Sequence, residues 1–280
     1  MQTDLPKLAL GTWLIGGTKE PDPNNDDAKD ISVIQTAIDS GITLIDTAQN
    51  YAAGRCEELV GEAIATLPRE SVKILTKQSR LKLSHEDVIQ GCHDSLARLG
   101  VETIDYFVCH APNADFDLKQ FFKATNQLHK EGLIQNVGVS NFGVKSLQIA
   151  VDSSELPIAL NQVSFSINDS DILTSGTYDF CLKHKIPVQA YRPLVDIQKE
   201  QDSYDLLLSI AKSSGLTPHQ VLIAYLNSYE GVNFTLRASS EEHWQQIKDA
   251  INVSLEQGYI GALKRVHMTK QGAFSKFLDL

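Results

Sequence analysis

Short runs of apolar residues alternate along the chain with longer segments in which apolar residues recur every three or four positions. The short runs predict β-strands, and the longer segments predict amphipathic helices with one face against a core. The alternation continues to the last apolar run, which ends at residue 236. The eight predicted strands cover residues 8–13, 42–46, 72–76, 106–109, 137–139, 158–162, 186–191 and 232–236.

Residues with strong conformational preferences mark the ends of the predicted helices. Gly41 and Gly132 each end a helical segment, and Ser84 precedes a carboxylate at capping distance. Thr217 and Gln220 form a capping box, and the proline between them suits the first turn of a helix. Strands that alternate with helices in this way are typical of a parallel sheet.

This alternation predicts a single (β/α)₈ barrel, a TIM barrel, that takes up the whole chain from residue 1 to residue 280. A doubly wound sheet is the second interpretation. However, no helix opens with the Gly-x-Gly-x-x-Gly pattern that such sheets use to bind dinucleotides. Residues 258–280 form a C-terminal tail that fits either over the barrel mouth or against the outer wall.

The composition is that of an ordinary globular protein, with 42% hydrophobic and 21% charged residues. A net charge of −10 argues against nucleic acids and anionic membranes as partners. The four cysteines contain no Cys-x-x-Cys pair, which favours reduced thiols over disulfides or a zinc site. There is no apolar signal-peptide core, and no apolar run approaches the ~20 residues that span a bilayer. We therefore expect a cytoplasmic protein.

Polar side chains lie at or just beyond the ends of three successive predicted strands. Asp46 ends the second strand and Tyr51 follows it, Lys77 closes the third, and His110 follows the fourth. In a parallel barrel these ends surround one mouth, where such enzymes carry their active sites. A lysine beside a tyrosine lowers the pKa of the phenol, an acid fixes the lysine, and a histidine can donate to a carbonyl oxygen. The set suits delivery of a proton to a carbonyl group.

Each of these residues also has an ordinary structural explanation. Asp46 could cap a turn, Lys77 could be a solvated lysine, Tyr51 a rim aromatic, and His110 the partner of a loop carbonyl. Their joint occurrence at consecutive strand ends favours the catalytic interpretation.

Nearly the whole chain resembles the aldo-keto reductase family. The resemblance rests on many short motifs in the same order rather than on any single one. They are Leu-Gly-Thr-Trp (10–13), Ile-Asp-Thr-Ala-Gln-Asn-Tyr (45–51), Glu-Glu-Leu-Val-Gly-Glu-Ala-Ile (57–64), Ile-Leu-Thr-Lys (74–77), Ser-Leu-Ala-Arg-Leu-Gly (95–100), Ile-Asp-Tyr-Phe-Val-Cys-His (104–110), Val-Gly-Val-Ser-Asn-Phe (137–142), Leu-Asn-Gln-Val (160–163) and Ala-Tyr-Arg-Pro-Leu (190–194).

The resemblance implies a barrel enzyme that uses NADPH or NADH to reduce an aldehyde or ketone to an alcohol. By this resemblance Tyr51 is the general acid, Lys77 lowers its pKa, Asp46 pairs with Lys77, and His110 orients the carbonyl. The protein groups act by placement and charge, and the coenzyme carries the hydride. No metal is implied. The expected partner is a small carbonyl compound, and the expected state is a monomer.

The coenzyme site is carried over by the same resemblance. Ser140, Asn141 and Gln162 are the implied ligands of the nicotinamide carboxamide, and Tyr191 is implied to stack on the ring. Without that context, the Ser-Asn pair is a plain turn and Tyr191 a core aromatic. Leu194, which closes the motif at residues 190–194, is assigned to the same site.

The subsite expected for a 2′-phosphate departs from the family pattern of a Lys-Ser pair followed by an arginine. Arg237, Ala238 and His243 stand at these positions. Arg237 can hold a phosphate in bidentate fashion. The serine hydroxyl is missing, and a neutral imidazole binds anions more weakly than a guanidinium. NADPH is the expected coenzyme and NADH an open alternative, and His243 fits an exposed helix position equally well.

The expected substrate pocket also differs from the family pattern. Trp13 matches an aromatic that lines the pocket, whereas Ala111 stands where many members have tryptophan, which predicts a wider pocket. Arg192 stands where serine is frequent. We hypothesise that it faces the coenzyme pyrophosphate or an anionic substrate, and a surface arginine is the alternative.

Two other functions fit parts of the pattern. One is a nucleotide-binding regulatory subunit without turnover, although all four catalytic residues are present. The other is a lyase that forms a Schiff base on Lys77, which requires a depressed lysine pKa that Asp46 would oppose.

Overall fold

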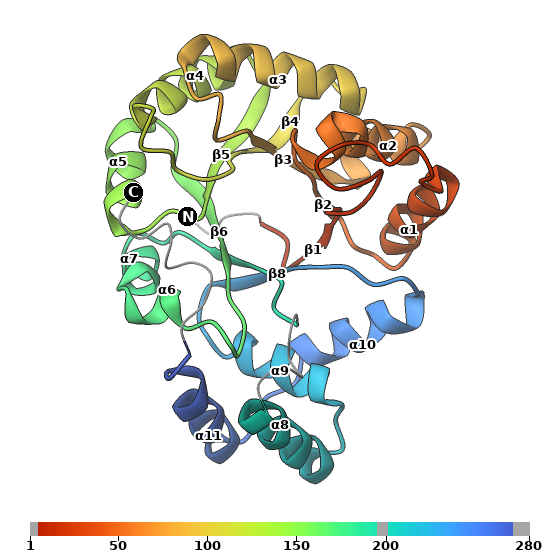
Figure 1. Cartoon of the computed structure of the whole chain (residues 1–280), viewed down its shortest axis with the longest axis vertical. Helices are drawn as coiled ribbons and strands as arrows, with labels where there is room; N and C mark the ends of the chain where they lie inside the picture. Colours follow the sequence, from red (N-terminus) through yellow and green to blue (C-terminus); the bar gives the residue numbers. More distant parts are fainter. Residues whose placement is uncertain (1–4, 195–200, 271–280) are drawn as a thin grey trace.

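Eight parallel strands close into a barrel, and the helices surround it (Figure 1). The structure is a computed structural model that describes residues 5–194 and 201–270. Each strand pairs with its neighbours in chain order, and β1 closes the ring on β8 with Leu8 opposite Phe234. The expected (β/α)₈ barrel is confirmed. The strands are β1 (Leu8–Gly11), β2 (Leu44–Asp46), β3 (Lys73–Gln78), β4 (Ile104–Cys109), β5 (Ile134–Ser140), β6 (Ile158–Ser164), β7 (Val188–Tyr191) and β8 (Val232–Leu236).

The helices begin and end largely where local signals predict. Ser84 accepts a hydrogen bond from the Asp87 N–H, Thr217 and Gln220 form the full capping box, and Gly132 has a φ of 78°. Helices α5, α6 and α11 lie outside the predicted segments. The helices are α1 (Asp27–Asp39), α2 (Arg55–Ile64), α3 (His85–Leu99), α4 (Leu118–Lys130), α5 (Val144–Ser153), α6 (Asp171–Thr174), α7 (Thr177–Lys183), α8 (Gln201–Ser214), α9 (Pro218–Asn227), α10 (Glu241–Ile251) and α11 (Gln257–His267), with short 3-10 helices η1 (Tyr51–Gly54) and η2 (Arg69–Ser71).

The barrel interior changes from apolar to polar along the strands. Alternate residues of a strand point to the same face, so residues two apart share the interior. On the interior face, Leu44 is thus followed two residues later by Asp46, and Leu75 by Lys77. In β6, Leu160 is followed in the same way by Gln162. The polar layer therefore lies toward the C-terminal ends of the strands. The apolar layer consists of Ala9, Leu44, Leu75, Tyr106, Val108, Ala159 and Leu160.

The helices cover the outer face of the barrel through a second, larger core. Phe107 of β4 stacks with Phe121 of α4 at a centroid distance of 6.3 Å. Helix α2 approaches the end of α3 so closely that a Cβ on Gly61 would lie 2.8 Å from the Leu99 carbonyl oxygen. This close packing fixes α2, which begins directly after the turn that carries Tyr51.

The described part of the predicted C-terminal tail lies against the outer wall, where α11 packs on α8 (Figure 1). His267 is fully buried, with Nδ1 3.0 Å from the Tyr225 hydroxyl and Nε2 2.9 Å from the Asp169 carbonyl oxygen. The helix is thereby attached to α9 and to the loop after β6. The last ten positions of the predicted tail, residues 271–280, lie outside the described residues.

Candidate active site

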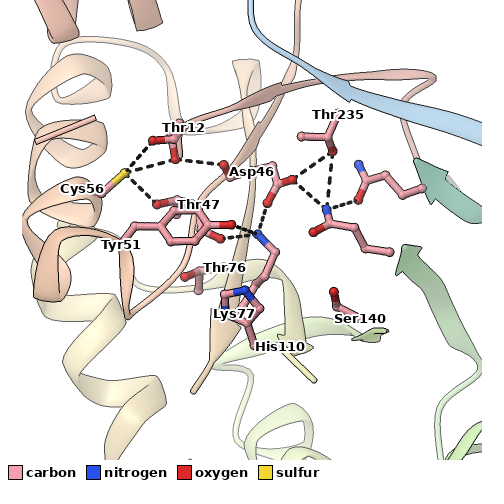
Figure 2. Close-up of polar contacts among 12 residues, drawn as sticks. Thr12, Asp46, Thr47, Tyr51, Cys56, Thr76, Lys77, His110, Ser140 and Thr235 are labelled. Carbon is pink, nitrogen blue, oxygen red and sulfur yellow. Dashed lines mark hydrogen bonds and ion pairs between the residues drawn. The ribbon is translucent and has the colours of Figure 1, made fainter. Parts of the chain in front are cut away.

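The four predicted catalytic residues meet at the mouth of the barrel (Figure 2). Lys77 and Asp46 are buried and form an ion pair between Nζ and Oδ1. Lys77 Nζ also donates to the Thr47 carbonyl oxygen at 2.8 Å and lies 3.4 Å from the Tyr51 hydroxyl. The Tyr51 and His110 rings are in edge contact, with centroids 5.7 Å apart. A carbonyl group that contacts both rings would lie beside two neutral hydrogen-bond donors.

Tyr51 lies at the start of a turn with unusual backbone angles. Ala52, Ala53 and Gly54 follow one another in the left-handed region, with φ values of 47°, 49° and 100°. Each left-handed alanine costs about 1–2 kcal/mol. Glycine suits position 54, because a φ of 100° strains any L side chain and a Cβ there would lie 2.8 Å from the Arg98 side chain. The turn leads directly from the end of β2 into α2 and leaves the Tyr51 side chain at the mouth.

Opposing effects act on the acidity of Tyr51. Burial raises its pKa, and the positive charge of Lys77 lowers it without overcoming the burial. The predicted influence of Lys77 is therefore present, but the predicted net lowering is wrong for the protein alone. A phenolate is poorly solvated in this pocket, and Lys77 is the cation placed to stabilise it.

Lys77 itself stays positively charged. Burial favours its neutral amine, but the Asp46 carboxylate and Tyr51 outweigh that effect and raise its pKa. Such an ammonium is a poor nucleophile, which argues against the Schiff-base alternative.

His110 is neutral at physiological pH. Burial, together with the positive charges of Lys77 and Arg80, lowers its pKa to about 3. Its Nδ1 is buried and has no hydrogen-bond partner among the described residues. A neutral imidazole can donate to a carbonyl oxygen, but it does not attract anions.

The second oxygen of Asp46 has two partners: Gln162, which was predicted only as a coenzyme ligand, and Thr235, which the sequence did not single out. Oδ2 accepts a hydrogen bond from Gln162 Nε2 at 2.7 Å and from the Thr235 hydroxyl at 2.9 Å. Gln162 Nε2 also donates to Gln189 Oε1 at 2.9 Å. Figure 2 shows this polar layer extending from Lys77 across the barrel to β8. The signal that could have found Thr235 is its position at the end of the last strand, two residues before Arg237.

A cavity of about 590 Å³ opens above this layer. We call the part lined by Trp13, Asn50, Tyr51 and His110 the substrate half. The part of the lining that was predicted to bind the coenzyme is called the coenzyme half; it includes Ser140, Asn141, Gln162, Tyr191, Arg192, Leu194 and Arg237.

Two predicted site residues lie away from this cavity. Ala111, which follows His110 in the chain, is buried, and His243 is exposed in the first turn of α10. Neither belongs to the described residues that line the cavity.

The coenzyme half is organised by Asn141, whose φ is 60°. Its Nδ2 donates to the Ser140 hydroxyl at 3.0 Å and to the His110 carbonyl oxygen at 3.2 Å. Its Oδ1 accepts from the Tyr191 hydroxyl at 2.9 Å, which fixes the Tyr191 ring. Both amide hydrogens of Gln162 are engaged, so Gln162 can offer a ligand its Oε1.

Two arginines give the coenzyme half the charge that an anionic dinucleotide needs. Arg192 is exposed at the rim, and Arg237 Nη1 donates to the Trp13 carbonyl oxygen at 3.2 Å. Arg237 Nη2 also lies 3.6 Å from Asp30 Oδ1. An aromatic face, amide and hydroxyl groups, and two guanidinium groups fit a nicotinamide dinucleotide.

The described part of the chain has neither a metal-binding cluster nor a membrane-spanning helix. No cluster of three or more His, Cys, Asp or Glu side chains there is arranged to hold a metal ion. No helix there is long and apolar enough to cross a membrane.

Comparison with known proteins gives a family for the chain. Residues 7–267 match the Aldo/keto reductase family. Methylglyoxal reductase YeaE of Escherichia coli (strain K12) is 28% identical over 96% of this chain and 93% of its own. The NADPH-dependent alpha-keto amide reductase of Saccharomyces cerevisiae is 29% identical over 76% of this chain and 70% of its own.

Solved structures agree with this match. A thermostable aldo-keto reductase in complex with the inhibitor epalrestat has a TM-score of 0.88 and 32% identity, covering 94% of this chain and 95% of its own. An aldo-keto reductase from Klebsiella pneumoniae in complex with NADPH has a TM-score of 0.81 and 28% identity, covering 94% and 91%. The chain therefore belongs to the aldo-keto reductase family, and it is an NAD(P)H-dependent oxidoreductase that reduces aldehydes or ketones.

Proposed function

We propose that this reductase acts on small 1,2-dicarbonyl compounds, in which a second oxygen lies beside the carbonyl that is reduced. The observation that carries the proposal is the neutral lining of the substrate half. Trp13 and Tyr51 are aromatic, His110 is uncharged, and Asn50 is an exposed residue of the same lining. Such a lining favours an uncharged substrate over a carboxylate, and the Asn50 amide can donate to the second oxygen. Two relatives are named for substrates of this kind, methylglyoxal and alpha-keto amides.

In the proposed reaction the substrate carbonyl oxygen accepts hydrogen bonds from Tyr51 and His110. The coenzyme, when bound, supplies the hydride that the carbonyl carbon accepts. Tyr51 gives its proton to the carbonyl oxygen, so the product is an alcohol. Lys77 stabilises the phenolate that remains until solvent returns the proton, and Asp46 holds Lys77 in place.

The coenzyme half is proposed to hold the dinucleotide. Ser140, Asn141 and Gln162 Oε1 bind the nicotinamide carboxamide, and the fixed ring of Tyr191 stacks on the nicotinamide. The arginines at the rim contact the phosphates.

NADPH is the proposed coenzyme because Arg237 can pair with a 2′-phosphate. Asp30 competes for that guanidinium, so NADH is the alternative that a direct comparison decides. We propose that the enzyme is a cytoplasmic monomer. Its four cysteines are free and buried, as expected for a protein in a reducing compartment.

A kinetic comparison of three small carbonyl compounds tests the substrate. Methylglyoxal has two adjacent carbonyls, propanal has one, and pyruvate has a carboxylate beside its ketone. With NADPH and NADH in parallel, we expect kcat/KM to be highest for methylglyoxal and lowest for pyruvate. The Asn50→Ala variant should lose about 3–10-fold with methylglyoxal, the value of one neutral hydrogen bond, and nothing with propanal. Equal losses with both aldehydes would contradict the role of Asn50.

The proton donor is tested separately. Tyr51→Phe should abolish turnover with every substrate and leave coenzyme binding, followed by fluorescence titration, nearly unchanged. A Tyr51→Phe variant that keeps most of its rate would show that another group delivers the proton.

A further inference from the structure

Asp46 holds its two carboxylate oxygens with groups from different strands. Oδ1 faces Lys77 of β3, and Oδ2 accepts from Gln162 of β6 and from Thr235 of β8. A carboxylate rotates about its Cβ–Cγ bond unless both oxygens are engaged. The donors on Oδ2 therefore set the direction in which Oδ1 meets the Lys77 ammonium.

The orientation of Thr235 is fixed by a glycine on the neighbouring strand β1. A Cβ built on Gly11 would lie only 2.8 Å from Thr235 Cγ2, so the threonine methyl fills the space that the glycine leaves open. β-Branched side chains have few allowed χ1 rotamers. With the methyl group against Gly11, the hydroxyl of Thr235 points at Asp46 (Figure 2).

We infer that Thr235 is a positioning residue for the proton transfer. Its hydroxyl holds the Asp46 carboxylate so that Lys77 stays within reach of the Tyr51 hydroxyl. Without it, only Gln162 holds Oδ2, so the carboxylate is less firmly oriented and the ammonium can shift away from Tyr51, which leaves the phenolate formed during reduction less stabilised. The inference rests on the proposed role of Tyr51 as proton donor, and it does not depend on which carbonyl compound is the substrate.

Thr235 separates positioning from coenzyme binding better than Gln162 does. Gln162 engages the same oxygen, but its Oε1 is also a proposed ligand of the nicotinamide. Valine has the shape of threonine and lacks only the hydroxyl, and serine keeps the hydroxyl and lacks the methyl. The three side chains therefore distinguish the hydrogen bond from the packing.

The first test measures NADPH-dependent reduction of benzaldehyde as a function of pH. In Thr235→Val we expect the kcat plateau to fall about tenfold, the effect of one hydrogen bond to a charged group. The descending limb at high pH, which reports loss of the acid's proton in the ternary complex, should move to higher pH because the acid is weaker. KM for NADPH should change less than about twofold, and Thr235→Ser should keep most of the parent rate.

Three results would overturn the inference. They are an unchanged kcat and pH profile in Thr235→Val, an equal loss in Thr235→Ser, or a loss that appears only in KM for NADPH. Thr125→Val is the matched control, since Thr125 is a buried threonine of α4 whose hydroxyl donates to the Phe122 carbonyl oxygen. It should leave kcat unchanged.

A second test uses the contact with Gly11 and does not require Thr235→Val to fold. Gly11→Ala should displace the Thr235 methyl and lower kcat in the same direction, about tenfold. Adding Thr235→Ser to Gly11→Ala removes the clashing methyl and should restore kcat to within about threefold of Thr235→Ser alone. A double variant no faster than Gly11→Ala would overturn the inference.

If Tyr51→Phe retains turnover, the proposed proton donor itself is wrong. If Tyr51→Phe is inactive while Thr235→Val matches the parent, only the role of Thr235 is wrong.

Discussion

Replacing Asp46 with asparagine keeps the shape of the side chain and removes the counter-charge of Lys77. Lys77 is fully buried, and the remaining described hydrogen-bond partners of its ammonium are the Thr47 carbonyl oxygen and the Tyr51 hydroxyl. Breaking a buried ion pair by removing one partner costs about 3–5 kcal/mol, because the other charge stays buried. At about 2–4 °C per kcal/mol for a domain of this size, the melting temperature should fall by on the order of 10 °C.

The sign of the pH dependence tests the cause of that loss. In the parent the pKa of Lys77 is raised, so its contribution to stability is complete below the unfolded value and is lost as pH rises through the folded one. In Asp46→Asn the burial remains without the carboxylate, so the folded pKa falls below the unfolded value. The unfolded chain then binds more protons, and stability rises with pH in the window below about 10.5. The deficit of the variant should shrink between about pH 7 and about pH 10.

Thermal unfolding followed by circular dichroism across this pH range measures both the loss of melting temperature and its change with pH. The double variant Asp46→Asn with Lys77→Met has no buried charge at this pair, so it should recover most of the lost stability and show no such slope. Glu155→Gln is the control, because Glu155 pairs with Lys130 at side-chain exposures of 59% and 65%. It should cost less than about 1 kcal/mol. A single variant that melts within about 2 °C of the parent, or a double variant no more stable than the single, would refute the reasoning.

Three further changes leave the side chains of the proposed catalytic residues unaltered. Ala53→Gly relieves an exposed left-handed alanine and should raise stability by up to about 1 kcal/mol in thermal melts with turnover unchanged; a lower melting temperature would contradict this. Gly61→Ala places a methyl 2.8 Å from the Leu99 carbonyl oxygen and should cost about 1–3 kcal/mol in urea unfolding, so an unchanged midpoint would show that α2 can move. Burial lowers the pKa of His267 to about 4, so stability should fall as pH drops from about 6.5 toward 4. In His267→Gln the urea midpoint should depend less on pH in this range. Parallel pH curves for the parent and the variant would exclude His267 as the cause of the fall.

The barrel and the meeting of the four proposed catalytic residues were predictable because both follow from simple periodicities. Strand–helix alternation at regular lengths specifies the parallel barrel, and parallel strand ends meet at one mouth. The two-residue period of a strand then places Asp46 on the face of Leu44, and Lys77 on the face of Leu75. Local sequence alone therefore brings the acid and the lysine into one interior layer.

Thr235 and Gln189 were not predictable in the same way. Their contacts depend on the register between strands, which places Gln162 opposite Gln189 and Tyr191 opposite Thr235. No local sequence pattern determines that register, and a threonine gives no signal of its own because it is common in strands. The net direction of the Tyr51 pKa shift was not predictable for a related reason. Lys77 can be identified from the sequence, whereas the extent of burial is a property of the assembled pocket.

The turn after Tyr51 shows where local preference and the folded chain disagree. Alanine disfavours the left-handed region, so nothing local predicts two such residues in a row at positions 52 and 53. Distant contacts maintain the turn: the Ala52 N–H donates to the Thr18 carbonyl oxygen at 2.7 Å, and Arg98 packs on Gly54 while it pairs with buried Glu57 at 2.7 Å. Strained backbone persists only where the surroundings over-determine it, and it concentrates at functional sites. Here the strain lies directly beside the proposed proton donor, which indicates that α2 and α3 stabilise the turn because it places Tyr51 within reach of Lys77.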